Sequence, residues 1–248
     1  HALLGENGAG KSTLLQVLYG LLTADAGTVT VGGRALPPGS PRDALAAGIG
    51  MVHQHFSQVS RMTVAENVWL GRPGLRFDRA AAAATVRRVG EWTGLVLDPA
   101  AMAGALSAGL RQRLEIVKAL AREVRVLILD EPTAALTPRE VDDLFAALRT
   151  LVAAGLGVVL ITHKLREVTA IAGRVTVLRR GEVVLTGPAR EFTPEQLGRA
   201  MIGKSASEEA LRLALEAAPA APAAPAASGA RRAGAVLVVQ GLTVAGAG

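Results

Sequence analysis

A phosphate-loop pattern near the start of the chain constrains its fold more than any other feature. Residues 5–12 read GENGAGKS and match the spacing G-x-x-x-x-G-K-[ST]. They follow the apolar residues 2–4 and precede a helical sequence. Glycines in such a loop let backbone N–H groups point inward around phosphates, and the following helix adds the positive end of its dipole. The pattern therefore predicts a strand, a phosphate-binding loop and a helix in succession.

Side chains of the same loop supply further groups that a nucleotide phosphate chain requires. Lys11 offers a compact positive charge to the β- and γ-phosphates, and Ser12 offers a hydroxyl to Mg²⁺. A glycine-rich turn before an ordinary helix is the structural alternative to this interpretation. The positions that we expect to contact the phosphates are Gly5, Asn7, Gly8, Gly10, Lys11, Ser12 and Thr13.

A buried strand that ends in two carboxylates is the second chemical signature. Residues 126–129 form the apolar run VLIL, and Asp130 and Glu131 follow directly. An apolar run without alternation is typical of a strand covered on both faces of a parallel sheet. Carboxylates at its end need a cation or water nearby. Together with the phosphate loop, they predict that Asp130 holds Mg²⁺ and that Glu131 acts as general base on the attacking water.

Strand and helix signals alternate along the chain. This alternation predicts an α/β fold with a mainly parallel sheet. Together with the phosphate loop it resembles the RecA-like core of the P-loop NTPases. The largely helical stretch 57–122 is predicted to be an inserted helical subdomain. Further strands are predicted at 28–31, 50–52, 124–129, 157–161, 174–179 and 182–186. The other helices are predicted at 41–47, 138–155 and 164–172 and from Thr193.

Composition changes along the chain indicate the domain boundaries. Residues 1–203 are predicted to form one nucleotide-binding domain. Residues 204–234 are rich in alanine and proline, which is typical of a semi-stiff linker. The apolar pattern VLVVQGLTV within 235–248 predicts the start of a second, truncated domain. Because the phosphate loop comes so early, we expect the first domain to be truncated at its N-terminus.

Composition also limits the possible chemistry. The chain of 248 residues, 50% of them hydrophobic, is long enough for one sizeable α/β domain. It has no cysteine, which excludes disulfides, thiolate zinc sites and cysteine nucleophiles. The net charge is +6, but the basic residues are scattered, so no nucleic-acid partner is predicted. The longest apolar stretch, residues 151–161, is shorter than the roughly 20 residues that span a bilayer.

A serine- and glycine-containing motif points to a family. Residues 106–110 read LSAGL before a helical sequence, so their backbone can present a second anion-binding helix N-terminus. A single domain cannot apply both anion sites to the same phosphate. The motif resembles the LSGGQ-like signature of the ATP-binding cassette (ABC) ATPases, with Ala108 in place of the first glycine. The resemblance implies two cassettes facing head to tail, with Ser107 and Gly109 contacting the γ-phosphate bound by the opposing cassette.

Two more positions match landmarks of the ABC ATPases. Gln54, after strand 50–52, matches the Q-loop glutamine, which the resemblance implies senses Mg²⁺ and water and couples to the membrane subunit. His163, after strand 157–161, matches the switch histidine at the γ-phosphate. The resemblance therefore implies catalytic roles for Glu131, His163 and Gln54, and metal contacts for Ser12, Gln54 and Asp130.

Individual residues within these motifs suggest a subgroup of the family. The loop GENGAGKST, and Thr137 in place of the usual aspartate after Ala135 and Leu136, resemble the bacterial carbohydrate and nucleoside importers. Those ATPases carry two cassettes on one chain, and the strand predicted within 235–248 fits the start of a second cassette. The stretches 51–56, 161–168 and 174–183 look closer to the nucleoside-type members than to the ribose-type members.

The resemblance implies a complete set of functional expectations. The activity is hydrolysis of ATP with Mg²⁺, coupled to import of nucleosides or simple sugars. The partners are transmembrane permease subunits, a substrate-binding protein and a second cassette, at the cytoplasmic face of the cell membrane. The alternative is a soluble tandem-cassette ABC protein acting on ribosomes. Such proteins join their cassettes by a long charged helical arm, which the Ala/Pro-rich segment 204–234 does not resemble.

Overall fold

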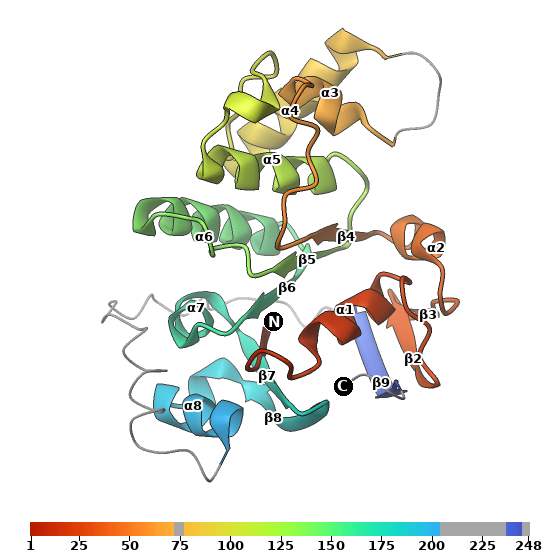
Figure 1. The fold of residues 1–248 in the computed structure, drawn as a ribbon, viewed down its shortest axis with the longest axis vertical. Coiled ribbons are helices and arrows are strands. Elements are labelled where there is room, and N and C mark those ends of the chain that lie inside the picture. Colours follow the sequence, from red (N-terminus) through yellow and green to blue (C-terminus); the bar gives the residue numbers. More distant parts are fainter. Residues whose placement is uncertain (72–76, 204–236, 245–248) are drawn as a thin grey trace. The chain divides into compact units, whose positions relative to one another are not determined.

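The computed structural model of the chain describes residues 1–71, 77–203 and 237–244 (Figure 1). The chain divides into two compact units. The first comprises His1–Ile49 and Val159–Gly248, and the second comprises Gly50–Val158. None of the helices in the described ranges is long and apolar enough to cross a membrane.

A mainly parallel sheet forms the centre of the first unit. β1 (Ala2–Leu4) lies between β6 (Gly157–Thr162) and β7 (Arg174–Arg179) and pairs with both in parallel. β8 (Glu182–Pro188) pairs antiparallel with β7. The strands β1 and β6 each lead, through a short loop, into a helix. This arrangement confirms the predicted α/β class with a mainly parallel sheet.

Polar caps set the starts of two helices in the first unit. Ser40 accepts a hydrogen bond from the backbone N–H of Asp43, and Thr193 forms a capping box with Gln196. These caps satisfy N–H groups that have no partner within the helix. The helices of this unit are α1 (Lys11–Leu18), α2 (Pro41–Ala46), α7 (Leu165–Ile171), the 3-10 turn η2 (Ala189–Glu191) and α8 (Pro194–Ile202).

A second, antiparallel sheet completes the first unit. β2 (Ala26–Val31) pairs with β3 (Arg34–Ala35) on one side and with β9 (Leu237–Thr243) on the other. The sequence predicted β9 as a strand but not its pairing with β2. The interpretation of 235–248 as the start of a second cassette stays a prediction, and the predicted linker 204–234 lies outside the described residues.

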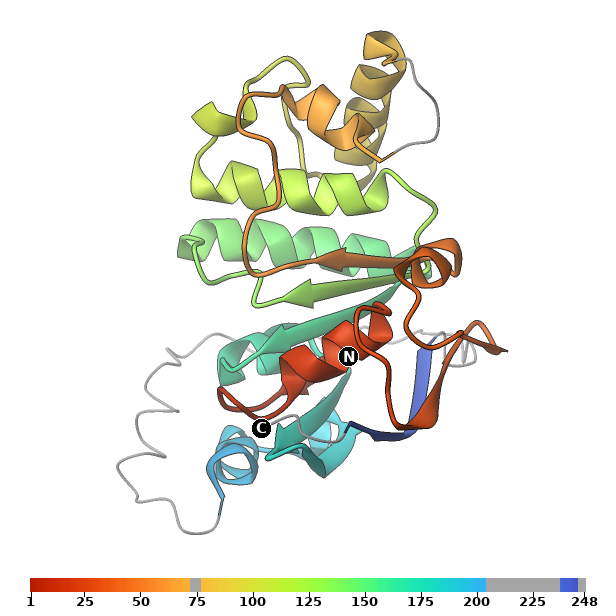
Figure 2. The same cartoon turned by 45° about the vertical axis from the view of Figure 1, so that its right-hand side comes forward.

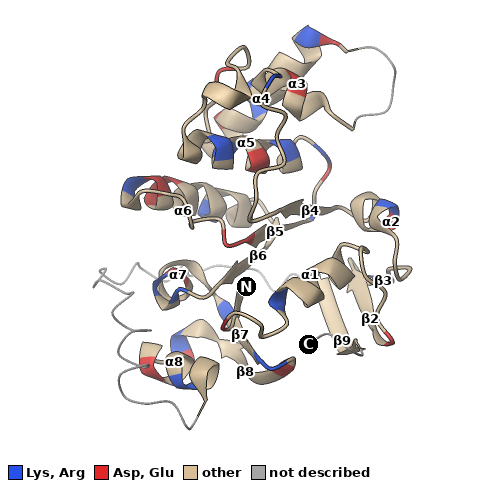
Figure 3. Ribbon diagram, in the orientation of Figure 1, with Lys and Arg blue, Asp and Glu red and all other residues tan. Residues whose placement is uncertain are grey.

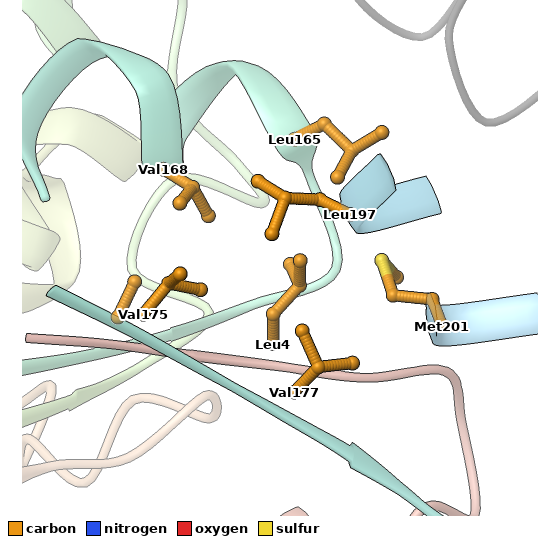
Figure 4. Close-up of a cluster of buried hydrophobic side chains, with 8 residues drawn as sticks. Leu4, Leu165, Val168, Val175, Val177, Leu197 and Met201 are labelled. Atoms are coloured by element: carbon orange, nitrogen blue, oxygen red, sulfur yellow. The ribbon is translucent and has the colours of Figure 1, made fainter. Parts of the chain in front are cut away.

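A buried aliphatic cluster joins β1 and β7 to α7 and α8 (Figure 4). Leu4 is fully buried in this cluster and directly precedes the phosphate loop. Burial of the cluster therefore fixes the end of the strand from which the loop departs. The labelled members of the cluster are Leu4, Leu165, Val168, Val175, Val177, Leu197 and Met201.

Two neighbouring strands anchor the second unit. β4 (Ile49–Val52) lies beside β5 (Val126–Asp130), and the two run in the same direction (Figure 2). The four apolar residues of β5 are at most 1% exposed. This burial confirms the prediction of a strand covered on both faces.

Helices make up most of the second unit. Helices α3, α4 and α5 pack on one another. Capping boxes start α3 and α6, as the spacing of Thr63 with Glu66 and of Thr137 with Glu140 predicts. The helices are α3 (Val64–Trp69), α4 (Arg79–Thr93), the 3-10 turn η1 (Ala103–Ala105), α5 (Ala108–Leu120) and α6 (Pro138–Ala153).

Positively charged residues are distributed over several helices and loops rather than gathered on one element (Figure 3).

The buried cluster generates a stability prediction. Replacement of Leu4 by alanine should lower the free energy of unfolding by about 2–5 kcal/mol, because it removes buried methyl groups and leaves a cavity. Replacement of Val183 by alanine, at a side chain 60% exposed on β8, should change it by less than about 0.5 kcal/mol. Urea unfolding of the two variants measures the difference, and equal losses would show that the cluster does not stabilise β1.

Candidate functional site

The phosphate loop has a backbone that only glycine accommodates at several positions. Gly8 and Gly10 have φ values of 80° and 97°, in the left-handed region. A Cβ atom at Gly5 would lie 2.5 Å from the carbonyl oxygen of Leu178 on β7. The glycines that the motif prescribes are therefore required by the geometry of this loop.

The side chain of Lys11 is hydrogen-bonded to the backbone of the loop. Lys11 is the first residue of α1 and is 7% exposed. Its Nζ atom donates hydrogen bonds to the carbonyl oxygens of Gly5, at 2.7 Å, and Glu6, at 2.8 Å. The ammonium group thus lies within the curve of the loop, where a phosphate oxygen would meet a desolvated positive charge.

The start of α1 is suited to an anion. The N-cap residue Gly10 has no side chain to accept hydrogen bonds, and the first turn contains no acidic residue. The first N–H groups of a helix have no intrahelical partner, and the helix dipole gives them a partial positive charge. Ser12 in this turn is exposed, so its hydroxyl is accessible.

The turn between β7 and β8 supports the phosphate loop. The backbone N–H of Gly181 donates to the carbonyl of Ala9 at 3.0 Å. A Cβ atom at Gly10 would lie 3.4 Å from the Cα atom of Gly181. Sequence reasoning missed this support because the two segments are far apart in the chain, and a glycine in a hairpin turn does not indicate what it contacts.

His163 lies at the same edge of the sheet as the phosphate loop. β1 and β6 are parallel neighbours, and Leu4 pairs with Thr162. Gly5 and His163 therefore leave adjacent strands side by side, and His163 is exposed there. The Thr162 hydroxyl accepts the backbone N–H of Lys164 at 3.0 Å, which shapes the turn that carries the histidine. The first unit thus brings together the two features that the sequence predicted to face the γ-phosphate.

The acidic pair and Gln54 lie in the second unit, at or just after the ends of two neighbouring strands. Asp130 is the last residue of β5, and both it and Glu131 are half-buried. Gln54 is exposed on the loop that follows β4. Glu131 has a φ of 44°, a left-handed conformation that is uncommon for a residue other than glycine. Such backbone conformations cost energy and cluster at functional sites. Sequence reasoning placed Glu131 but did not predict its conformation.

Ser107 and Gly109 form the start of α5. The Ser107 hydroxyl accepts the backbone N–H of Leu110 at 3.3 Å and so caps the helix. Gly109 is buried, and a Cβ atom on it would collide with the carboxylate of Glu140 on α6. Ala108 is exposed. Packing against Glu140 therefore favours glycine at position 109, in addition to the role that the signature resemblance implies.

Glu140 belongs to a polar cluster that joins α5 to α6. Its carboxylate accepts the backbone N–H and the hydroxyl of Thr137, each at 2.9 Å. These two hydrogen bonds, aided by the positive charge of Arg113, hold the pKa of Glu140 below its usual value. Arg113 also pairs with Asp143 at 2.7 Å. The signature helix is thus attached to the helix that follows the acidic pair.

The candidate magnesium ligands suit an ion that is held together with a nucleotide. In the described part of the chain, no group of three or more His, Asp or Glu side chains could hold a metal alone. Mg²⁺ is commonly bound by one or two protein groups together with phosphate oxygens and water. An accessible hydroxyl at Ser12 and a half-buried carboxylate at Asp130 have the chemistry that this mode requires.

Comparison with known proteins decides the family. The sequence profile described as ABC transporter matches residues 1–134, more than half of the chain. The chain belongs to this family. The fold of this ABC cassette is similar to that of cbiO1 from Clostridium perfringens, part of the ABC transporter complex cbiONQ. The TM-score is 0.67 at 29% identity, over 77% of each chain.

Curated relatives of the cassette are import proteins. It is 45% identical to the nucleoside import ATP-binding protein NupA of Lactococcus lactis, over 84% of this chain and 42% of the relative. It is 45% identical to the ribose import ATP-binding protein RbsA 1 of Rubrobacter xylanophilus, again over 84% and 42%. The chain therefore spans about two-fifths of the length of these relatives, and equal identities do not separate nucleoside from ribose import.

The contact between Gly109 and Glu140 generates a second prediction. Replacement of Gly109 by alanine should lower the melting temperature by about 2–4 °C, because the new methyl group displaces the Glu140 carboxylate from the α6 capping box. The same replacement in a Glu140→Ala background should have little further effect. Thermal unfolding of the four proteins in this cycle measures the coupling, and an equal drop in both backgrounds would contradict the contact.

Proposed function

We propose that this cassette binds and hydrolyses MgATP and thereby drives a membrane importer. The observation that carries the proposal is the phosphate loop, in which a buried Lys11 and an open helix N-terminus provide positive charge inside a glycine backbone. Few other ligands match such a site as well as a nucleotide phosphate chain does.

The first unit supplies the groups that bind the phosphates. The N–H groups of the loop bind the phosphate oxygens, supported by Gly5, Gly8 and Gly10, and Lys11 neutralises charge on the β- and γ-phosphates. His163 follows the neighbouring strand β6, from which it would face the γ-phosphate. Asn7 and Thr13 complete the loop contacts.

The second unit supplies the groups for hydrolysis. Glu131, which follows β5 directly, would take a proton from the attacking water as general base. Ser12, Asp130 and Gln54 are the residues that would hold Mg²⁺, and the ion would supply positive charge against the phosphate oxygens. Ser107 and Gly109 bind the γ-phosphate held by a second cassette, so two cassettes complete each site.

Import as the biological role rests on the relatives. The nucleoside and ribose import proteins are similar to this chain over most of its length. We infer that the cassette works with transmembrane permease subunits and a substrate-binding protein at the cytoplasmic face of the membrane, and that it transports a nucleoside or a simple sugar. Residues 1–203 would form one cassette, the helical stretch 57–122 its subdomain, and residues 235–248 the start of a second.

Two substitutions test the ATPase assignment. Lys11→Ala should abolish ATP binding because it removes the charge inside the loop, whereas Arg42→Ala, at an exposed position on α2, should not.

Glu131→Gln should bind ATP normally but lower kcat by about 100-fold or more, since general base catalysis contributes about 10²–10⁴-fold. Glu123→Gln is the matched control, because Glu123 is exposed in the same unit. ATP binding and phosphate release measure these effects, and unchanged turnover in Glu131→Gln would refute the assignment of the base.

Stimulation of the ATPase tests the import role. The complete cassette protein, reconstituted with its permease in proteoliposomes, should hydrolyse ATP severalfold faster when the transported nucleoside or sugar is supplied with its binding protein. The measurement is phosphate release across a panel of nucleosides and sugars. Recovery of the protein with ribosomes rather than with membranes, together with no stimulation by any member of the panel, would contradict import.

A further inference from the structure

The loop that carries Gln54 is bonded to the signature helix α5. The backbone N–H of Ser57 donates to Glu115 Oε1 at 3.0 Å, and the Ser57 hydroxyl donates to Glu115 Oε2 at 2.9 Å. Lys118, one turn further along α5, donates to the same hydroxyl at 3.1 Å and to both carboxylate oxygens at 3.1–3.2 Å. Ser57, Glu115 and Lys118 thus form a closed polar cluster, which we name the Glu115 latch.

Burial of Glu115 strengthens the hydrogen bonds that it accepts, although Ser57 itself is exposed. Glu115 is only 6% exposed, and the side chain of Lys118 is 18% exposed. A buried carboxylate needs hydrogen-bond donors or a paired cation, and hydrogen bonds to a charged group are about twice as strong as neutral ones. Ser57 and Lys118 meet that requirement together. The two hydrogen bonds from Ser57 to this buried carboxylate therefore hold Ser57 in place.

The continuation of the loop is held as firmly as Ser57. The amide of Asn67, which is 1% exposed, accepts the N–H of Val59 at 2.8 Å and donates to three loop carbonyls. The carbonyls of Ser60 and Met62 accept N–H groups from η1, the turn that leads to the signature motif. Ser57, Val59, Ser60 and Met62 are therefore hydrogen-bonded to α5, α3 and η1, and Gln54 lies on the short segment between β4 and Ser57.

The position of the latch on α5 relates it to the signature. Ser107 caps the N-terminus of α5, and Glu115 follows two turns later, about 12 Å away at 1.5 Å per residue. One rigid helix thus carries the signature at its end and the attachment point of the Gln54 loop near its middle.

We propose that Glu115 is a positioning residue that fixes the Gln54 loop to the signature helix, so that the two nucleotide-facing segments of the second unit move together. The proposal rests on the ATPase function proposed above for Gln54 and Ser107. Glu115 does not itself contact nucleotide. Its effect is on the rate of the catalytic cycle rather than on the affinity of the phosphate loop, which lies in the other unit.

Two variants and a matched control test the latch. Glu115→Gln removes the charge and the ion pair, and Ser57→Ala removes only the hydroxyl and leaves the carboxylate with Lys118. Ser60→Ala is the control, because Ser60 is exposed on the same loop and its backbone carbonyl is the group that the structure uses. The measurements are kcat and KM for ATP and hydrogen exchange of residues 53–59 in the absence of nucleotide.

The expected pattern separates positioning from general stability. Glu115→Gln should speed hydrogen exchange at 53–59 by about tenfold, the effect of weakening one charge-assisted hydrogen bond. Both variants should lower kcat severalfold without changing KM for ATP, and the double variant should be no slower than Glu115→Gln. If Glu115→Gln does not fold, Ser57→Ala with unchanged melting temperature and lowered kcat supports the proposal.

Other outcomes overturn the proposal. Turnover and exchange equal to those of Ser60→Ala would show that the latch does not position Gln54. Losses of kcat that multiply in the double variant would show that Ser57 and Glu115 act independently. A wrong ATPase assignment would give a different result. The parent protein would hydrolyse ATP no faster than Lys11→Ala, whereas the hydrogen-exchange measurement would still test the latch.

Discussion

The ammonium group of Lys11 is buried, and a buried charge must be surrounded by oxygen atoms. The carbonyls of Gly5 and Glu6 provide them, and they can do so only because the loop curves back over the first turn of α1. That curvature depends on glycines in the left-handed region and on the support of the Gly181 turn. The strand before the loop is in turn held by the buried cluster around Leu4. The contacts of the first unit thus hold one positive charge at the carboxyl-terminal end of β1, inside a mainly parallel sheet.

The second unit has a different physical organisation. Its candidate site residues are at the ends of two strands and one helix, and polar contacts join the Gln54 loop to α5 and the start of α5 to α6. Glu115 attaches the Gln54 loop to α5, and Glu140 packs against Gly109 at the start of that helix. Both acids are bonded to hydroxyl and backbone groups of loops that carry functional residues. Glu115 on α5 and Glu140 on α6 therefore fix the geometry of loops, whereas Asp130 and Glu131 are proposed to act in the chemistry.

The sequence predicted most elements because their signals are local. The phosphate loop, the capping boxes at Thr63 and Thr137 and the apolar strand before Asp130 are all visible within a few residues. The contacts that it could not predict are made between distant segments. The pairing of β9 with β2 and the latch between Ser57 and Glu115 leave no local pattern. The left-handed φ of Glu131 is equally invisible, because an acidic residue after a strand indicates no particular backbone conformation.

The main proposal is that Lys11 and the N–H groups of the loop bind nucleotide phosphates. A crystal structure of the protein with Mg²⁺ and a non-hydrolysable ATP analogue tests it most directly. The account predicts that the β- and γ-phosphates lie against the N–H groups of residues 8–13. It also predicts that Lys11 Nζ moves from the carbonyls of Gly5 and Glu6 to phosphate oxygens. A nucleotide bound elsewhere, or a Lys11 that keeps both carbonyl contacts and touches no phosphate, would contradict it.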